Sequence, residues 1–108
     1  MDFKEGIIYS KPYYKLIKIK YIETIDIYLK FINWVAGEFD LFLQDESEGL
    51  KVYYPNGWLS IKSDIKLKTE MNLQITIVNK SKVVCEKTNT KLDSIYNHIY
   101  KNYSIIDD

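Results

Sequence analysis

The chain contains no arginine, one cysteine and one histidine among its 108 residues. Without arginine it has no planar guanidinium for bidentate contact with phosphate, carboxylate or guanine, and lysine binds phosphate only as a point charge. Cys85 has no partner for an internal disulfide, and with only His98 beside it no structural zinc site is expected. Side chains that usually carry out chemistry at neutral pH are therefore almost missing.

Long apolar runs, a basic leader and glycine-rich loops are also lacking. No apolar run approaches the roughly 18–20 residues that span a bilayer, and the first residues do not form a basic region followed by an apolar one. The four glycines are isolated, so no phosphate-binding loop is present. We therefore expect a cytoplasmic protein with no membrane segment, no cofactor, no metal site and no catalytic residues.

The formal net charge is +0, which argues against a general nucleic-acid binder and equally against an acidic mimic of DNA. Residues 38–48 are acidic and contain no lysine, whereas lysines dominate the later half of the chain. This distribution predicts either a bipolar surface or a simple scatter of charge. The lack of arginine, with abundant isoleucine, lysine, asparagine and tyrosine, indicates an AT-rich coding sequence of a low-GC bacterium or its mobile element.

The length fits a single domain over residues 1–108. Residues 6–9 could form a short edge strand that Pro12 ends. In residues 15–21, Ile17, Ile19 and Tyr21 face one way, and Lys18 and Lys20 face the other. This alternation is typical of a half-buried strand.

Residues 24–36 fit a helix better than a strand, although the alternation and β-branched content also suit a strand. A polar stripe at helical spacing is formed by Glu23, Asp26, Lys30 and Asn33. We expect the opposite face to carry the apolar side chains Ile22, Ile25, Leu29, Ile32 and Ala36. Thr24 can cap the start of this helix, and Gly37 is placed where a left-handed C-cap belongs.

After Gly37 the pattern has a period of two through Gln44, and the acidic run 45–49 reads as a solvated turn. Residues 50–54 and 58–62 form a hairpin around Pro55 and Asn56. This register sets Val52 opposite Leu59 on one face and groups Tyr53, Trp58, Lys51 and Ser60 on the other. A three-residue loop with Gly57 in a bulge is the alternative, but it spoils this segregation.

Residues 73–77 alternate as a strand, residues 79–81 turn the chain, and residues 82–86 return as a strand. A C-terminal helix follows, capped by Asn89 or Thr90, with one apolar face made of Leu92, Ile95, Ile99 and Tyr103. The order of elements predicts an α+β fold. We expect an antiparallel sheet of five to six strands, one helix after the first strand, and a C-terminal helix packed on the sheet.

The candidates for catalysis are weak. A nucleophilic pair of Cys85 and His98 would need the last helix to cover the last strand, and a free cysteine in an alternating apolar strand is usually a core residue. Asp26 and Glu23 belong to a charged stripe that is typical of a solvated helix face. The acidic turn 45–48 lacks the ligand spacing of a calcium loop. We therefore predict that the protein is not an enzyme.

Aromatic side chains are abundant, with 10 Tyr, 2 Trp and 4 Phe. Tyrosine and tryptophan are enriched at interface hot spots because they bury a large area and keep a polar group. We predict a partner-binding site formed by an aromatic anchor on the hairpin with an adjacent acidic stretch: Tyr53, Trp58, Lys51, Asp45, Glu46 and Glu48. A structural role for Tyr53 and Trp58, and base stacking on the sheet, are the other interpretations.

The sequence thus predicts a small, non-catalytic protein-binding module that blocks a surface of a larger host or toxin protein, as steric inhibitors, anti-defence proteins and immunity proteins do. Homodimer formation is also compatible with exposed aromatics and sheet edges, and nucleic acid is a less favoured partner. The alternative is a small-ligand or nucleotide binder with a pocket between the sheet and the C-terminal helix, lined by Tyr96, Tyr100 and Tyr103.

Overall fold

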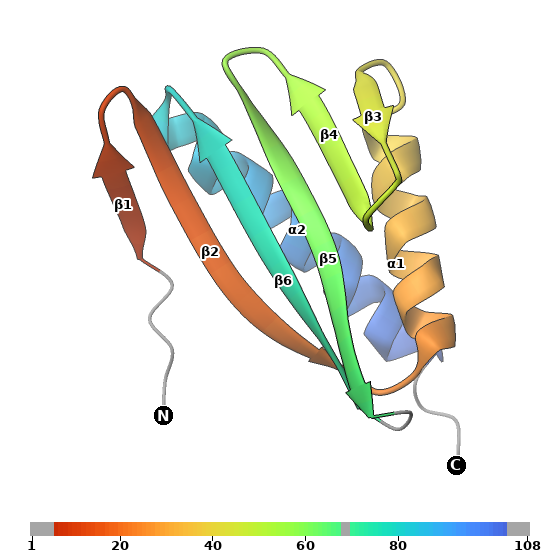
Figure 1. Ribbon diagram of the computed structural model, residues 1–108. Coiled ribbons are helices and arrows are strands. Elements are labelled where there is room, and N and C mark those ends of the chain that lie inside the picture. Colours follow the sequence, from red (N-terminus) through yellow and green to blue (C-terminus); the bar gives the residue numbers. More distant parts are fainter. Residues whose placement is uncertain (1–5, 68–69, 104–108) are drawn as a thin grey trace.

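A computed structural model describes residues 6–67 and 70–103, and the side chains among them except those of 64–71 and 103. These described residues form six strands and two helices: β1 (Ile7–Ser10), β2 (Tyr13–Ile22), α1 (Ile25–Glu38), β3 (Leu43–Asp45), β4 (Leu50–Tyr54), β5 (Gly57–Leu67), β6 (Glu70–Asn79) and α2 (Lys82–Tyr103). Figure 1 shows the sheet in the order β1-β2-β6-β5-β4-β3, and every neighbouring pair is antiparallel. The predicted α+β class is confirmed.

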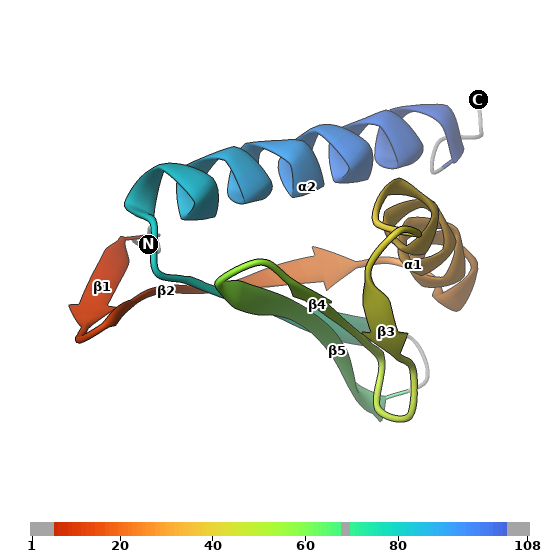
Figure 2. The same cartoon turned by 90° about the horizontal axis from the view of Figure 1, so that it is seen from above.

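The molecule has two layers. Both helices cover the same face of the sheet, and we call the opposite, uncovered face the open face (Figure 2). The core lies between the sheet and the helices and is formed by buried apolar side chains of β2, β4, β5, β6, α1 and α2. No helix within the described ranges has the length and apolar character that crossing a membrane requires.

Strand β2 shows the predicted alternation, but the buried side is the opposite of the one that its isoleucines suggest. Lys18 points at the helices and is 1% exposed, whereas Ile17, Ile19 and Tyr21 lie on the open face at 44%, 49% and 52% exposure. Lys18 tolerates this position because its ammonium lies 2.5 Å from the carboxylate of Asp93 on α2. The same inversion leaves apolar side chains of β2 uncovered.

Helix α1 is confirmed, and so is its N-terminal cap, because the Thr24 side chain accepts a hydrogen bond from the backbone N–H of Ile27 at 3.2 Å. The predicted left-handed C-cap at Gly37 is wrong, because Gly37 is helical and the cap residue is Phe39. The predicted buried face is wrong in part. Ile27, Phe31 and Val35 are buried, with Ile32 and Ala36 partly buried, whereas the expected Ile25 and Leu29 are exposed. The predicted stripe and the observed stripe both have helical spacing. The stripe that contains the large Phe31 ring is the buried one, because it packs against α2 and the sheet.

The predicted extended segment after Gly37 is wrong over residues 38–42. The helix passes through Gly37 to Glu38, and the chain then turns, with the N–H of Phe42 donating to the carbonyl of Phe39 at 3.0 Å. The Gln44 side-chain amide donates to the carbonyls of Ala36 at 3.0 Å and Phe39 at 2.8 Å. These bonds satisfy carbonyl groups at the helix end, so only Leu43–Asp45 remains as a strand.

The hairpin of β4 and β5 has the predicted register. Val52 is opposite Leu59, Leu50 is opposite Ile61, and Tyr54 pairs with Gly57, which leaves Pro55 and Asn56 as the loop. Asn56 adopts a positive φ of 66°, which asparagine tolerates better than most residues. The alternative three-residue loop is therefore not formed.

The predicted strand over residues 82–86 is helical instead. Helix α2 begins at Lys82, well before Asn89 or Thr90, because the Ser81 hydroxyl accepts a hydrogen bond from the N–H of Val84 at 3.2 Å. Its buried stripe continues at spacings of three and four residues: Cys85, Thr88, Leu92, Ile95 and Ile99. A short β-branched run is compatible with a strand or a helix, and here the Ser81 cap and the buried stripe favour the helix. The side chain of Tyr103 lies outside the described set.

Candidate functional site

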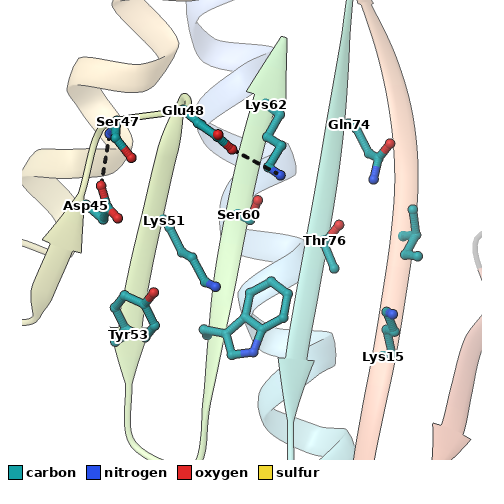
Figure 3. A pocket seen from close by; sticks show the side chains of 12 residues that line it. Lys15, Asp45, Ser47, Glu48, Lys51, Tyr53, Ser60, Lys62, Gln74 and Thr76 are labelled. Carbon is teal, nitrogen blue, oxygen red and sulfur yellow. Dashed lines mark hydrogen bonds and ion pairs between the residues drawn. The ribbon is translucent and has the colours of Figure 1, made fainter. Parts of the chain in front are cut away.

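The open face of the sheet is hollowed over its central strands. This depression, which we call the open-face hollow, has a volume of about 490 Å³. Figure 3 shows the side chains that line it, which come from β2, β3, the turn after β3, β4, β5 and β6: Lys15, Ile17, Asp45, Ser47, Glu48, Lys51, Tyr53, Trp58, Ser60, Lys62, Gln74 and Thr76.

One wall of the hollow is aromatic. Tyr53 of β4 is paired with Trp58 of β5, and the neighbouring pair is Lys51 with Ser60. The ammonium of Lys51 lies 4.3 Å from the ring centroid of Trp58 and 5.0 Å from that of Tyr53. Exposed cation–π contacts contribute about 0.5–1 kcal/mol each, so Lys51 helps to hold both rings. Trp58 is half-buried, while Tyr53 is 38% exposed.

The acidic rim of the hollow is built by a tight turn. Asp45 of β3 is paired with Lys51, and its carboxylate accepts a hydrogen bond from the backbone N–H of Ser47 at 2.9 Å. The backbone and side-chain hydrogen bonds of Ser47, followed by the charge of Lys51, lower the pKa of the Asp45 carboxyl. The carboxylate of Glu48 lies 3.8 Å from the ammonium of Lys62 on β5. The Asp45 carboxyl of the rim is therefore ionised at neutral pH.

The structure brings most of the predicted partner-binding residues to one place. Tyr53, Trp58, Lys51, Asp45 and Glu48 all line the open-face hollow. The remaining one, Glu46, is exposed in the same turn outside the lining.

Next to the hollow, the open face carries an apolar strip along β2. Tyr13, Ile17, Ile19 and Tyr21 lie along it, and all of them are exposed. The sequence did not place this strip beside the aromatic wall, because the pairing of β2 with β6, and of β6 with β5, joins segments that are far apart in the chain. Charge alternation in β2 also suggested the opposite orientation.

Sequence reasoning also missed the polar floor of the hollow. Ser60 and Thr76 are paired across β5 and β6, and Gln74 and Lys15 complete the same surface. The hairpin register predicts Ser60 only as a neighbour of Lys51. A single hydroxyl side chain in an alternating strand does not by itself indicate a binding role. That these residues lie together follows only from the order of the strands in the sheet.

Tyr96 and Tyr100, two of the three tyrosines proposed to line a pocket under the last helix, make contacts within the fold. Tyr96 packs edge-on against Phe31, with ring centroids 5.8 Å apart, and its hydroxyl donates to the carbonyl of Tyr21 at 2.8 Å. The Tyr100 ring stacks on Tyr96 and its hydroxyl is 3.3 Å from the carboxylate of Glu23. Burial, followed by the charges of Tyr100 and Glu23, raises the pKa of Tyr96.

Cys85 and His98 do not form a catalytic pair. Both lie on α2, and a rise of 1.5 Å per residue separates them by about 20 Å along the helix axis. The His98 ring instead contacts Trp34 edge-on, with centroids 4.9 Å apart. Cys85 is buried, its thiol donates to the carbonyl of Tyr14 at 3.6 Å, and burial raises its pKa.

Cys85 should therefore be inert toward thiol reagents while the protein is folded. Access requires opening of the core, so we expect labelling in native buffer to be about 1000-fold slower than in denaturant. The rates can be measured with a chromogenic disulfide reagent. Similar rates in the two conditions would contradict the burial of this thiol.

No group of three or more histidine, cysteine or carboxylate side chains able to hold a metal ion occurs within the described part of the chain. No family model matches the sequence, and no curated protein matches it at a significant level.

Proposed function

We propose that this chain is a small, non-catalytic protein-binding module that uses its open face to occupy a surface of a larger protein. The observation that carries the proposal is the uncovered sheet face, on which large apolar side chains of β2 lie on one side of the polar floor and the aromatic wall of β4 and β5 on the other. Apolar patches rimmed by polar groups are typical of interaction sites. A cytoplasmic location is part of the same proposal.

The mechanism would be steric. Tyr53 and Trp58 are the proposed anchors, because aromatic side chains held by a neighbouring cation lose little conformational freedom on binding. Asp45, Glu46 and Glu48 at one side of the face would steer a basic surface of the partner toward it. The AT-rich coding bias supports an inhibitor or neutralising protein of a low-GC bacterium or its mobile element, with a host enzyme or a toxin as the target.

The test is affinity capture from a low-GC bacterial lysate with mass-spectrometric identification, using the parent and a Tyr53→Ala/Trp58→Ala variant. The partner so identified is then titrated by calorimetry. Each true anchor should contribute about 2 kcal/mol or more, so each single substitution should weaken binding at least about 30-fold. The variant should retain its circular dichroism spectrum, because both side chains lie outside the helix-facing core.

Trp34→Ala is the matched control. This tryptophan is similarly exposed but lies on α1, on the other side of the sheet, so its loss should leave partner binding unchanged. Equal capture by the parent and the double variant would refute the assignment of the open face. If no protein is captured, the alternative function is binding of a small ligand in the open-face hollow. Such binding would raise the melting temperature when the ligand is added.

A further inference from the structure

Two hydroxyl groups, those of Ser60 and Thr76, form the floor of the open-face hollow. Ser60 and Thr76 are adjacent across β5 and β6 and are only 6% and 7% exposed. Neither hydroxyl has a hydrogen-bond partner among the side chains and backbone groups that the structure describes. Both side chains face the hollow (Figure 3), and neither hydroxyl oxygen is among the fully buried, unpaired atoms of the described residues, so both are accessible from the hollow. The floor is therefore equipped to hydrogen-bond a group that enters from outside.

The charges around this floor favour an anion of low charge. Three lysines and two carboxylates line the hollow, which leaves a balance of one positive charge. Lys62 is near Glu48, and Lys51 lies over the aromatic rings. Lys15 has neither a carboxylate nor a ring as partner in the described part of the chain. Its position on β2 is next to that of Ile17, which pairs with Thr76.

We propose that the floor of the open-face hollow binds one carboxylate side chain presented by the partner protein. Lys15 would supply the positive charge, the hydroxyls of Ser60 and Thr76 would donate charge-assisted hydrogen bonds to the carboxylate, and the aromatic wall would cover the apolar stem of the same side chain. This inference rests on the proposed function and names the chemistry that the partner must present.

The net charge separates this ligand from other anions. A single carboxylate balances one positive charge, whereas a phosphate dianion or a nucleic-acid backbone would bring excess negative charge close to Asp45 and Glu48. The chain also lacks arginine, the side chain best suited to bidentate phosphate contacts. A cationic ligand would meet three lysines. The acidic rim thus acts as a filter against polyanions.

The test is a titration of isotope-labelled protein, followed by NMR, with the α-amide of N-acetylglutamate as the probe. The neutral glutamine analogue and inorganic phosphate are the comparison probes. We expect saturable shifts at Ser60 and Thr76 in the millimolar range, with the glutamate probe binding about tenfold more tightly than the glutamine analogue, since a charge-assisted hydrogen bond is stronger than a neutral one.

Two variants remove the proposed contacts without touching the aromatic wall. Ser60→Ala/Thr76→Val deletes both hydroxyls at nearly constant volume, and Lys15→Met deletes the charge; each should weaken binding of the glutamate probe about tenfold. Lys87→Met is the control, because Lys87 is an exposed lysine on α2. The spectra of the variants report directly whether each is folded.

Equal binding of the glutamate and glutamine probes, tighter binding of phosphate, or no saturable shift would overturn the inference. Its failure is distinct from failure of the proposed function. A partner captured through Tyr53 and Trp58, with no carboxylate preference in the titration, would retain the interface and reject the carboxylate site. Carboxylate binding by a chain that captures no protein would retain the site and reject the protein-binding function.

Discussion

Replacing Asp93 with asparagine is expected to destabilise the protein by about 3 kcal/mol, because it leaves the buried ammonium of Lys18 without a counter-charge. Asp93 also lies 3.3 Å from Lys20, so one carboxylate serves two lysines of β2. For a domain of this size such a loss corresponds to a fall in melting temperature of roughly 10–20 °C. Denaturant unfolding at pH 7 gives the free energy directly.

The matched substitution is Lys18→Met, which replaces the buried charge by an apolar side chain of similar length. Asp93 then keeps Lys20 as partner and is one-third exposed, so the cost should stay below about 1 kcal/mol. In the Lys18→Met background, Asp93→Asn should lose most of its effect. An undiminished cost of Asp93→Asn in that background would show that the Lys18 pair is not the cause.

The Lys18–Asp93 pair makes the stability of the protein depend on pH in the acidic range. Burial acts to raise the pKa of Asp93, but the hydrogen bond and charge of Lys18, together with Lys20, outweigh it and hold the pKa below its ordinary value. The folded-state pKa is thus below the unfolded value of about 3.9. The contribution is fully present above that pH and is lost as the pH falls through the folded-state pKa. The difference in the free energy of unfolding between the parent and the Asp93→Asn variant should therefore become smaller in this acidic range.

The second large effect is expected for Gly49→Ala, which should cost about 3 kcal/mol. Gly49 has a φ of 87°, and an added Cβ would lie 2.2 Å from the carbonyl oxygen of Ile61 and 3.1 Å from the Cα of Lys62. These are backbone atoms of β5, so relief of the clash must separate β4 from β5. Thermal unfolding measures the loss, and NMR shifts of Glu48 would report movement of the acidic rim.

Gly37→Ala is the matched control for glycine replacement. Gly37 lies in α1, and its added Cβ would meet nothing within 4 Å. Alanine is the better helix former, so this change should stabilise the protein by about 0.5 kcal/mol. A shift of stability in the same direction for both substitutions would contradict the close backbone approach at Gly49.

The sequence predicted elements best where a local signal and the tertiary structure agree. The hairpin around Pro55 and Asn56 has a register that segregates its two faces, and Thr24 caps α1 as expected. The errors fall where two patterns compete. Residues 82–86 are β-branched yet helical, because Ser81 caps them and Cys85 continues the buried stripe of α2.

The site was predictable only within one hairpin. Tyr53, Trp58 and Lys51 are brought together by a two-residue turn, so their cluster follows from local register. Lys15 and Thr76 join them through β6, across sequence separations of tens of residues that carry no local signal. The position of Lys18 under the helices depends on Asp93 of α2. No pattern within β2 indicates a partner so distant in the chain.

Because the helices cover one side of the sheet only, successive residues of each strand have different roles, one in the core and the next on the open face. In β5, Leu59 and Ile61 maintain the fold, while Trp58 and Ser60 contact the exterior. Alternate positions can therefore be randomised as a set while the others are held fixed. The strands thus offer a scaffold whose recognition specificity could drift, or be re-engineered toward a new target, without rebuilding its interior.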